Sequence, residues 1–448
     1  MRIDGLGAAG EGVGRVDGFT LFIPGALPGE RVRVKVVKVK QRFGYARLLE
    51  VIEAAAERTS PPCPIFRQCG GCQLQHLSYE GQLRYKRQWV SDCLERIGHL
   101  RGIPVHPVLG MAQPWRYRNK AQVPVGRAEE GGLVAGFYAG GSHRMVPMEE
   151  CAIQHESNDR VVRAVRQVAE ELGLEPYEEA SHRGMLRHIV AKVGFSTGEV
   201  MVVLVTRGER LPHAERLVER LREKIPGLAS VVQNVNPERT NVILGRENRL
   251  LWGKEAIVDR IGPLAFAISA SSFYQVNPVQ TEVLYGKALE YAGLSGEETV
   301  IDAYCGIGTI SLFLAQRARK VYGVEVVPEA IEDARRNARL NEIENVEFVV
   351  GTAEEVLPRW VEAGVRADVV VVDPPRKGCE ESLLEAIVQM RPSRMVYVSC
   401  DPATLARDLR YLSERGFVVQ EVQPVDMFPH TVHVECVVLM SRVEKSKG

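Results

Sequence analysis

The spacing of hydrophobic residues changes twice along the chain and divides it into three regions. Residues 1–56 contain short segments in which apolar and polar positions alternate, which is typical of β-strands. Residues 57–265 mix strand-like and helix-like periodicities. The predicted helices of this central region are Val161–Leu172 and His213–Lys224, and its predicted strands are Glu199–Val205 and Leu228–Asn234.

Residues 266–448 alternate short apolar strands with amphipathic helices. The predicted strands are Val300–Ala303, Lys320–Val324, Val346–Val350, Asp368–Val372 and Met395–Ser399, and the predicted helices include Thr309–Ala318 and Pro328–Asn341. Regular alternation of this kind indicates a parallel, doubly wound (Rossmann-like) sheet. We therefore predict an α/β protein with a small N-terminal β-barrel, a mixed α/β central domain and a C-terminal doubly wound domain.

The segment Arg31–Lys40 alternates cations with valines, so one face of the predicted strand is positive and the other is apolar. A small barrel with a positive face suits a nucleic-acid backbone. A solvated edge strand that is protected by its charges is the other interpretation. The segment resembles the TRAM domain, an RNA-binding barrel, and this resemblance favours the first interpretation.

The composition is that of a globular protein without a bulk charge that would attract nucleic acid. Among 448 residues, 57 are Lys or Arg and 57 are Asp or Glu, so RNA binding needs local basic patches. No apolar stretch reaches the ~18–20 residues of a membrane span, and the N-terminus lacks the apolar core of a signal peptide. We expect a cytoplasmic monomer with no membrane anchor, and its nine cysteines are candidates for metal binding or catalysis rather than for disulfides.

A glycine-containing loop follows the first strand of the C-terminal region. Gly306 and Gly308 would let the backbone approach a ligand at the end of this strand. Glu325, at the end of the next strand, is placed to accept hydrogen bonds from ribose hydroxyls. Cys305 replaces the first glycine of the dinucleotide fingerprint, so the pattern suits S-adenosylmethionine, which has a ribose but no phosphate. An ordinary tight turn is the other interpretation.

The fourth and fifth predicted strands of this region are each followed by a side chain that can take part in chemistry. Asp373 begins an Asp-Pro-Pro sequence at a strand end that faces the cofactor crevice of a doubly wound sheet. Cys400 follows the fifth strand, with Asp401 as the predicted helix cap and Pro402 in the first helical turn. A thiol beside a helix N-terminus has a lowered pKa and can act as a nucleophile. We therefore predict that Cys400 is a functional cysteine.

A cysteine nucleophile beside a methyl donor indicates methylation at carbon 5 of a pyrimidine. This carbon becomes nucleophilic when a thiolate adds to carbon 6. A base must then remove the hydrogen at carbon 5 so that the cysteine can leave. Glu435, in an apolar strand near the C-terminus, is the candidate base, because burial would raise its pKa toward the range useful for proton transfer. A structural strand residue paired to Arg or Lys is the other interpretation.

Three cysteines, Cys63, Cys69 and Cys72, are grouped in a turn-rich segment. With a fourth cysteine from elsewhere they suit either zinc or a [4Fe–4S] cluster. Their spacing differs from the C-x3-C-x2-C of a radical enzyme, so the sequence does not support a radical role. Cys93 lies in a helical pattern, and we expect it to contribute to packing.

Two stretches have the composition of an RNA-binding surface. Trp115–Lys120 interleaves aromatic residues and cations, and Ser181–His188 is basic. Each stretch taken alone is also typical of a solvated face, but with the cationic barrel strand they could form one continuous surface. A target uridine must be unstacked to reach Cys400, so loops and bulges are the expected substrates.

Six motifs occur in order along the chain. They are Cys63-x5-Cys69-x2-Cys72, Phe273-Tyr274-Gln275-Val276-Asn277, Asp302-Ala-Tyr304-Cys-Gly-Ile-Gly, Asp373-Pro-Pro-Arg, Ser399-Cys400-Asp401-Pro402 and His433-Val-Glu435. Together they resemble the RNA (uracil-5-)-methyltransferase family, in particular its iron–sulfur 23S rRNA branch. The resemblance covers nearly the whole chain, but Thr309 stands where the rRNA branch often has Asn.

Carried over residue by residue, the resemblance implies that Cys400 is the nucleophile and Glu435 the general base. The S-adenosylmethionine contacts that it implies are Gln275, Tyr304, Glu325 and Asp373. The implied ligands of a [4Fe–4S] cluster are Cys63, Cys69, Cys72 and Cys151.

The sequence therefore predicts three domains and one reaction. Residues 1–56 form a TRAM-like RNA-binding barrel, 57–265 a central iron–sulfur and RNA-binding domain, and 266–448 an S-adenosylmethionine-dependent methyltransferase domain. The predicted reaction is methylation of carbon 5 of a uridine in 23S rRNA.

Two alternatives stay open at this point. One is methylation of a T-loop uridine in tRNA, and the other is a non-catalytic iron–sulfur RNA-binding assembly factor. The second could tolerate loss of Cys400 and Glu435, yet both are present. A cytosine-5 methyltransferase is disfavoured, because the RNA enzymes of that kind usually carry two cysteines near the site.

Overall fold

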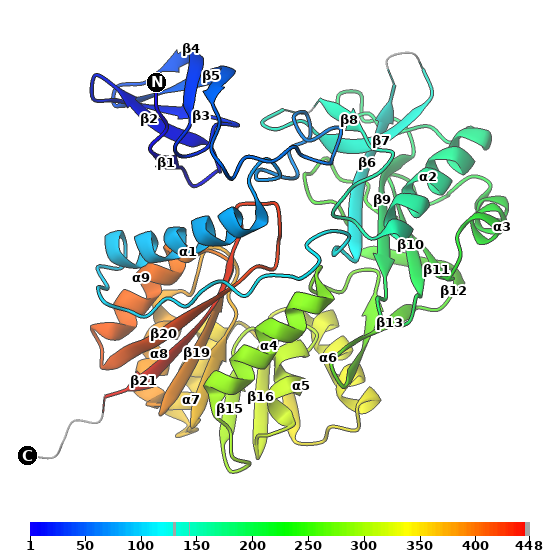
Figure 1. Cartoon of the computed structure of the whole chain (residues 1–448). Helices are drawn as coiled ribbons and strands as arrows, with labels where there is room; N and C mark the ends of the chain where they lie inside the picture. The colour runs from blue at the N-terminus through cyan, green and yellow to red at the C-terminus, as the bar shows by residue number, and fades with distance from the viewer. Residues whose placement is uncertain (129–130, 143, 444–448) are drawn as a thin grey trace, which may run out of the picture.

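The computed structural model describes residues 1–128, 131–142 and 144–443 and arranges them in three connected bodies (Figure 1). The N-terminal barrel and a central sheet stand side by side, and a doubly wound sheet lies below both in this view. Among the helices of these residues, none combines the length and the apolar character that a bilayer crossing requires.

Five short strands form the N-terminal sheet, in the order β1-β2-β3-β5-β4. They are β1 (Gly5–Leu6), β2 (Gly12–Val16), β3 (Phe19–Ile23), β4 (Arg31–Val39) and β5 (Phe43–Glu53). An isolated bridge between Arg2 and Arg31 joins the two edges of the sheet, and such closure makes a barrel. The predicted small β-barrel is confirmed.

Strand β4 departs from its predicted two-faced form beyond its middle. Val32 is buried, but Val36, Val37 and Val39 are exposed. The pairing with β5 slips between Val36 and Lys38, and a bulge of this kind turns the following side chains away from the regular face. Val36, which precedes the slip, and Val39, which follows it, line an open hollow of about 680 Å³ together with the core residues Leu21 and Val32.

The central sheet has seven strands in the order β12-β11-β10-β9-β6-β7-β8, in which β10 and β11 are parallel. The strands are β6 (Lys120–Arg127), β7 (Leu133–Tyr138), β8 (Met145–Pro147), β9 (Leu186–Val193), β10 (Val200–Thr206), β11 (Leu228–Val235) and β12 (Glu247–Gly253). Helices α2 (Glu156–Glu171) and α3 (Ala214–Lys224) share a buried apolar cluster with the sheet. The predicted elements of this region are confirmed, although α2 begins earlier than predicted.

A hairpin of β13 (Ala256–Ile261) and β14 (Leu264–Ser269) leads to the C-terminal sheet, whose order is β17-β16-β15-β18-β19-β21-β20. Its strands are β15 (Thr299–Asp302), β16 (Lys320–Glu325), β17 (Val346–Val350), β18 (Val369–Val372), β19 (Arg394–Ser399), β20 (Phe417–Val425) and β21 (Glu435–Arg442). The first five strands in this order are parallel, and β21 is antiparallel to both β19 and β20. The predicted parallel, doubly wound sheet is confirmed.

Helices cover both faces of this sheet, and their apolar sides bury the strands. The helices are α4 (Pro278–Ala292), α5 (Thr309–Ala315), α6 (Pro328–Leu340), α7 (Ala353–Glu362), α8 (Glu381–Met390) and α9 (Pro402–Ser413). Side chains of α4, α5 and α6 form one apolar cluster, and those of α7, α8 and α9 form the other. All four valines of β18 are fully buried, as expected for a strand that is covered on both faces.

One helix of the central region belongs to the C-terminal body. Helix α1 (Tyr79–Arg96) lies along α9 and β20 (Figure 1), and Val90, Cys93 and Leu94 join the apolar cluster there. Cys93 is thus a packing residue. Residues 57–265 therefore contribute to two bodies of the molecule, and residue 265 lies inside β14.

Candidate active site

The parallel strands of the C-terminal sheet bring several of the predicted site residues to one edge. Glu325 ends β16, Tyr304 follows β15, Asp373 follows β18 and Cys400 follows β19. In a doubly wound sheet, the crevice at the carboxyl ends of the strands is where ligands bind. The edge therefore unites residues that are up to about 100 positions apart in the chain.

Gln275 joins this edge through Tyr285 of α4, a residue that the sequence did not single out. The Tyr285 hydroxyl contacts the Gln275 side chain and lies 3.1 Å from Thr309 Oγ1. The Asn119 side chain donates a hydrogen bond of 2.9 Å to the Gln275 carbonyl. Tyr285 is fully enclosed in the apolar cluster of its helix, so its sequence position indicated packing and gave no signal of a site.

The loop after β15 holds the acidic side chain expected to meet a ribose. The N–H of Gly306 donates to Glu325 Oε2 (3.2 Å), and that of Val327 donates to Oε1 (3.0 Å). Gly306 has a φ of 54° and no atom within 4 Å of the place where a Cβ would stand, so this side of the loop is open. The Tyr304 hydroxyl donates to Glu354 Oε1 of α7 (2.8 Å).

Strands β19 and β21 bring the candidate nucleophile and the candidate base together. Ser399 is the last residue of β19 and pairs with Cys436. Cys400 directly follows Ser399 and Glu435 directly precedes Cys436, so both flank the last pair of this register. The two side chains are near enough for the charge of Glu435 to act on the Cys400 thiol. Asp401 caps α9 as predicted, because its side chain accepts from two backbone N–H groups of the helix at 2.9 and 3.1 Å.

The Cys400 thiol has a raised pKa, contrary to the sequence-based expectation. Burial raises the pKa of Cys400 to about 12, and the charges of Glu435 and Asp373 add to this rise. Arg376 acts in the opposite direction. The prediction of a lowered pKa is therefore wrong, because burial and two acidic neighbours outweigh the helix N-terminus.

The carboxyl groups at this edge also have raised pKa values. Burial raises the pKa of Glu435 to about 8, with the charge of Asp373 as the second cause. Glu435 is 5% exposed, as the sequence predicted. Burial and the charge of Asp302 raise the pKa of Asp373 to about 7. An edge that gathers such groups favours a positively charged ligand, which would lower each of these pKa values.

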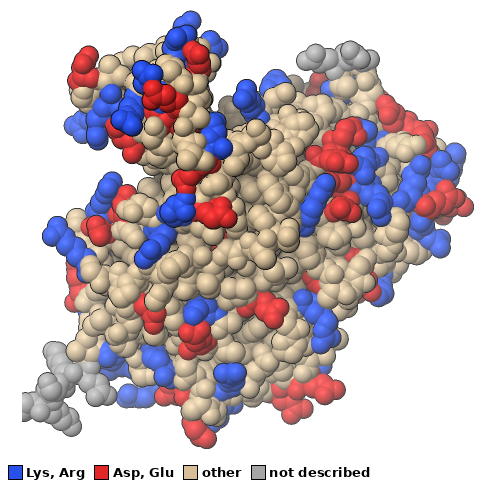
Figure 2. Space-filling view, in the orientation of Figure 1, with Lys and Arg blue, Asp and Glu red and all other residues tan. Residues whose placement is uncertain are grey.

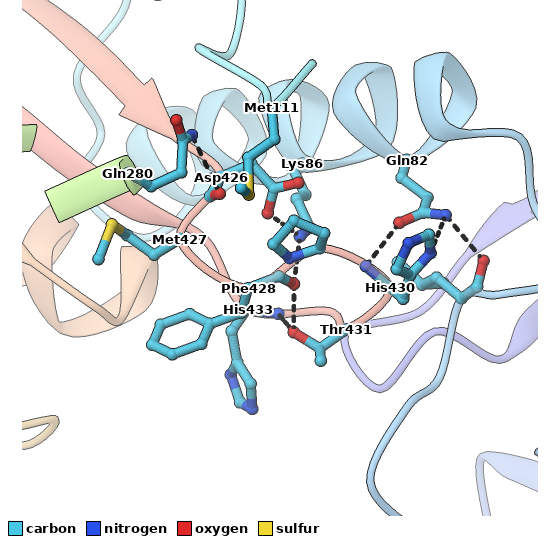
Figure 3. Close-up of polar contacts among 12 residues, drawn as sticks. Gln82, Lys86, Met111, Gln280, Asp426, Met427, Phe428, His430, Thr431 and His433 are labelled. Atoms are coloured by element: carbon cyan, nitrogen blue, oxygen red, sulfur yellow. Dashed lines mark hydrogen bonds and ion pairs between the residues drawn. The ribbon is translucent and has the colours of Figure 1, made fainter. Parts of the chain in front are cut away.

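The loop between β20 and β21 leads directly into the strand of the candidate base, and α1 holds it in place (Figure 3). Lys86, which is fully buried, donates to Asp426 Oδ1 (2.5 Å) and to the Phe428 carbonyl (3.1 Å). Gln82, one helical turn earlier, accepts from the backbone N–H of His430 (2.8 Å) and contacts its ring nitrogen (3.2 Å). Helix α1 thus holds in place the loop that precedes Glu435 in the chain.

The stretch Trp115–Lys120 contacts the same loop through its two aromatic residues. Trp115 stacks on the His430 ring, with centroids 3.6 Å apart. Tyr117 is 1% exposed and donates to the Pro429 carbonyl (3.0 Å). Both aromatic residues of this stretch therefore have partners within the protein, and its RNA-binding role stays a prediction.

In the second basic stretch, Ser181–His188, Arg187 is buried and has partners within the protein, whereas Arg183 is exposed. Arg187 is 4% exposed and donates to the carbonyls of Asn236 (2.6 Å) and Glu238 (2.7 Å). Its guanidinium also lies 4.4 Å from the centre of the Tyr177 ring. Arg187 is therefore not available to RNA, and the RNA-binding role of the rest of the stretch stays a prediction.

The predicted cysteine ligands are neighbours in the central region. Burial raises the pKa of Cys72 to about 12, and the thiols of Cys151, Cys69 and Cys63 add to the rise. The N–H of Gly71 points at Cys69 Sγ (3.3 Å). In the part of the chain that the structure describes, no three His, Cys, Asp or Glu side chains stand in the geometry of a metal site.

The cysteine segment is also linked to the loop before Glu435. The N–H groups of Gln73 and Leu74, which directly follow Cys72, both donate to the His430 carbonyl (3.0 and 2.9 Å). A change in the conformation of the cysteine segment would therefore break these hydrogen bonds and alter the conformation of the loop before Glu435.

Family models match both ends of the chain. Residues 218–443 match the model of tRNA (uracil-5-)-methyltransferases, and residues 2–49 match that of the TRAM domain. The second match confirms the resemblance of the barrel to TRAM.

Complete chains of known proteins are similar to this one along nearly its whole length. An uncharacterized RNA methyltransferase of Halalkalibacterium halodurans is 63% identical over 440 residues, 98% of this chain and 96% of its own. One from Clostridium tetani is 53% identical over 441 residues, 98% of this chain and 95% of its own. The crystal structure of Pyrococcus abyssi tRNA (uracil-54, C5)-methyltransferase in complex with S-adenosyl-L-homocysteine matches with a TM-score of 0.79 at 29% identity, over 98% of this chain and 99% of that one. This chain belongs to the RNA (uracil-5-)-methyltransferase family, with a TRAM domain at its N-terminus.

Proposed function

We propose that the protein methylates carbon 5 of a uridine in RNA, with S-adenosylmethionine as the methyl donor. The observation that carries this proposal is the closeness of Cys400 to Glu435, at the sheet edge that also holds Asp373 and Glu325. Membership of the family supports it, as does the S-adenosyl-L-homocysteine bound to the Pyrococcus abyssi relative.

The residues at this edge fit S-adenosylmethionine. Glu325 would accept hydrogen bonds from the ribose beside the open side of Gly306, and Gln275, Tyr304 and Asp373 would complete the site. The raised pKa of Asp373 marks a place where a cation is favoured. When bound, the cofactor supplies an electrophilic methyl group on a positively charged sulfur.

Cys400 and Glu435 would act in sequence on the uracil ring. The Cys400 thiolate adds to carbon 6, and the electrons of the carbon 5–carbon 6 double bond shift toward the carbonyl at carbon 4. Carbon 5 of this enolate then takes the methyl group. The Glu435 carboxylate removes the proton from carbon 5, the double bond re-forms, and the bond between sulfur and carbon 6 breaks to release the thiolate.

The pKa values of the free protein fit this division of labour. A pKa of about 8 for Glu435 makes it a base of useful strength near neutral pH. The raised pKa of Cys400 means that the thiol must lose its proton before it attacks, and the carboxylate of Asp373 is a neighbouring acceptor that leaves Glu435 free to act as the base at carbon 5. A positively charged ligand at the edge would lower the pKa of Cys400.

For the target we propose a uridine in 23S rRNA, on the resemblance of the ordered motifs and the four cysteines to the rRNA branch. A T-loop uridine in tRNA is the second candidate. The similarity to Pyrococcus abyssi tRNA (uracil-54, C5)-methyltransferase along 98% of this chain favours it.

Methyl transfer to RNA from cells that lack the protein separates these targets. The purified protein and radiolabelled S-adenosylmethionine are incubated with the rRNA and, separately, the tRNA of such cells, and the product is mapped. We expect label at carbon 5 of a uridine in 23S rRNA. Label confined to tRNA would move the target to the T-loop, and label in neither RNA would contradict the proposed reaction.

We also propose that Cys63, Cys69, Cys72 and Cys151 hold a [4Fe–4S] cluster. Four neighbouring thiols whose charges oppose one another are a donor set that a cationic cluster would stabilise. The N–H that points at Cys69 Sγ is the kind of donor that supports cluster sulfurs. The cluster would brace the segment that bonds to the His430 carbonyl.

Protein purified without oxygen is expected to contain about four iron and four sulfide per chain. Cys151→Ala should lose the iron and sulfide, because it removes one ligand. Cys93→Ala is the matched control and should keep both, because Cys93 packs in α1. Chemical assays of iron and sulfide measure the result, and stoichiometric zinc without sulfide would contradict the assignment.

A further inference from the structure

The loop 374–379 lies against the first turn of α9, the helix that begins two residues after Cys400. The Thr404 hydroxyl donates to the Arg376 carbonyl (3.0 Å), and it is also 3.3 Å from the Asp401 carbonyl. One side chain of the helix thus ties the backbone of Arg376 to the residue that directly follows Cys400. The Arg376 side chain is exposed, so the position of its guanidinium depends on where this backbone is held.

A buried carboxylate of the same helix holds the other end of the loop. Asp408 is 1% exposed and accepts hydrogen bonds from the Cys379 N–H (2.8 Å) and from the Tyr397 hydroxyl of β19 (2.6 Å). Arg407 donates to the second oxygen of Asp408 through Nε (2.8 Å) and Nη2 (2.7 Å), and Nη2 also donates to the Lys377 carbonyl (2.9 Å). Because a buried carboxylate is costly unless donors surround it, Asp408 stabilises the arrangement in which the loop, β19 and α9 meet.

The loop approaches Asp408 too closely for any side chain at position 378. Gly378 has a φ of 77°, and a Cβ there would lie 2.5 Å from Asp408 Oδ2 and 2.6 Å from Arg407 Nη2. Glycine is the residue that combines this left-handed backbone conformation with so close an approach. The sequence of the loop is therefore adapted to contact with the Asp408 carboxylate.

Arg376 supplies a positive charge that acts on the Cys400 thiol. It lowers the pKa of this thiol, whereas the charges of Glu435 and Asp373 raise it. The titratable and charged groups around Cys400 are Glu435 and Cys436 of β21, His433 before this strand, Asp373 and Arg376 after β18, and Asp401 at the start of α9. On the face of the molecule that Figure 2 shows, basic and acidic side chains are intermixed, so the effects of distant charges largely cancel. The position of Arg376 therefore has a direct effect on how readily the thiolate forms.

We propose that Asp408 is a positioning residue for the methylation reaction, which holds the loop 374–379 against α9 and so keeps the Arg376 guanidinium beside the Cys400 thiolate. The inference rests on the proposed function and adds to it a residue that acts through Arg376. The Cys400 sulfur carries a negative charge twice in each reaction cycle, before it adds to carbon 6 and after it leaves. A cation that is fixed beside the sulfur stabilises both states without having to move during the reaction.

Asp408→Asn should slow the alkylation of Cys400. The amide nitrogen of asparagine cannot accept the hydrogen bonds of Arg407, so the loop loses part of its attachment to α9 and Arg376 is no longer fixed. Iodoacetamide, which is uncharged, is added to the full-length protein at about pH 8, and mass spectrometry follows the peptide that contains Cys400. We expect the rate to fall roughly three- to tenfold, because the fraction of thiolate falls while the nucleophilicity of the remaining thiolate rises slightly.

Arg376→Gln decides whether Asp408 acts through this cation. Arg376→Gln alone should slow the alkylation at least as much as Asp408→Asn does. Adding Asp408→Asn to Arg376→Gln should change the rate by less than about twofold, because no cation is left to position. Glu30→Gln is the matched control and should react like wild type, since Glu30 is a fully buried carboxylate with an arginine partner, Arg58, but belongs to the barrel. Thermal unfolding checks each variant, and Thr404→Val, which removes the bond to the Arg376 carbonyl, replaces Asp408→Asn if that protein unfolds early.

Two outcomes would overturn the positioning role of Asp408. One is an Asp408→Asn protein whose Cys400 is alkylated at the wild-type rate. The other is a loss of rate that persists in full when Arg376→Gln is already present, because the carboxylate would then support the fold without acting through Arg376. Alkylation needs neither RNA nor S-adenosylmethionine, so a wild-type protein that methylates no uridine contradicts the proposed function and leaves the measured effect of Asp408 on Cys400 intact.

Discussion

Cys400→Ala is expected to lower the rate of methyl transfer by about four orders of magnitude or more, because the variant has no nucleophile to activate carbon 5. Transfer of a radiolabelled methyl group to RNA measures the rate. Binding of RNA and of S-adenosylmethionine should persist, since the alanine removes one sulfur atom from an edge that other residues build. Cys93→Ala, a buried cysteine of α1, is the matched control and should retain activity.

A trapped adduct tests the same residue by a second route. RNA with 5-fluorouridine at the target should link covalently to wild-type protein, because fluorine cannot leave as a proton and the sulfur remains on carbon 6. A denaturing gel resolves the linked complex from free protein, and Cys400→Ala should give no such band. Continued methylation of uridine by this variant would refute the assignment of the nucleophile.

Glu435→Gln is expected to methylate the RNA but to remain bound to it. The amide has nearly the shape of the carboxyl group yet cannot accept the carbon 5 proton, so the methylated adduct should accumulate and release product slowly. Addition itself should not suffer, because the Glu435 charge raises the pKa of Cys400 and its removal lowers that pKa. The readout is a covalent complex on a denaturing gel that carries the label of the methyl group.

The dependence on pH gives a further check on Glu435. Only the carboxylate form accepts a proton, and the pKa of Glu435 is raised to about 8. Product release by wild type should therefore accelerate as the pH rises toward and through about 8, and this dependence should be absent from Glu435→Gln. A variant that releases free product at the wild-type rate would show that another group is the base.

Much of the candidate site could be predicted from local patterns. Strands that alternate with helices place their carboxyl ends at one edge, so Glu325, Asp373 and Cys400 could be assigned to one crevice before their positions were known. The cap that Asp401 forms on α9 depends on its neighbours in the chain, and it was predicted for the same reason. Burial of Glu435 followed from the apolar residues around it.

The barrel shows where a local pattern fails. Alternation predicted one apolar face for β4, but its pairing with β5 slips after Val36, and Val36, Val37 and Val39 are all exposed. Trp115 and Tyr117 show the same limit in the central region, because their contacts with the loop before Glu435 join residues more than 300 positions apart. Register between strands is a property of the pair, and neither strand encodes it alone.

The sequence by itself determined which elements form, in which order, and which side chains stand at the strand ends, because these depend on residues within a few positions of one another. Only the tertiary structure decided the pKa values of the site residues and the contacts that hold the loop before Glu435 in place. The pKa of Cys400 rises because segments distant in the chain bury it and place Glu435 and Asp373 beside it. Lys86 lies 340 positions from the Asp426 carboxylate that it meets in the interior. Burial and electrostatic interaction depend on distance in space, so they become defined only when the chain has folded.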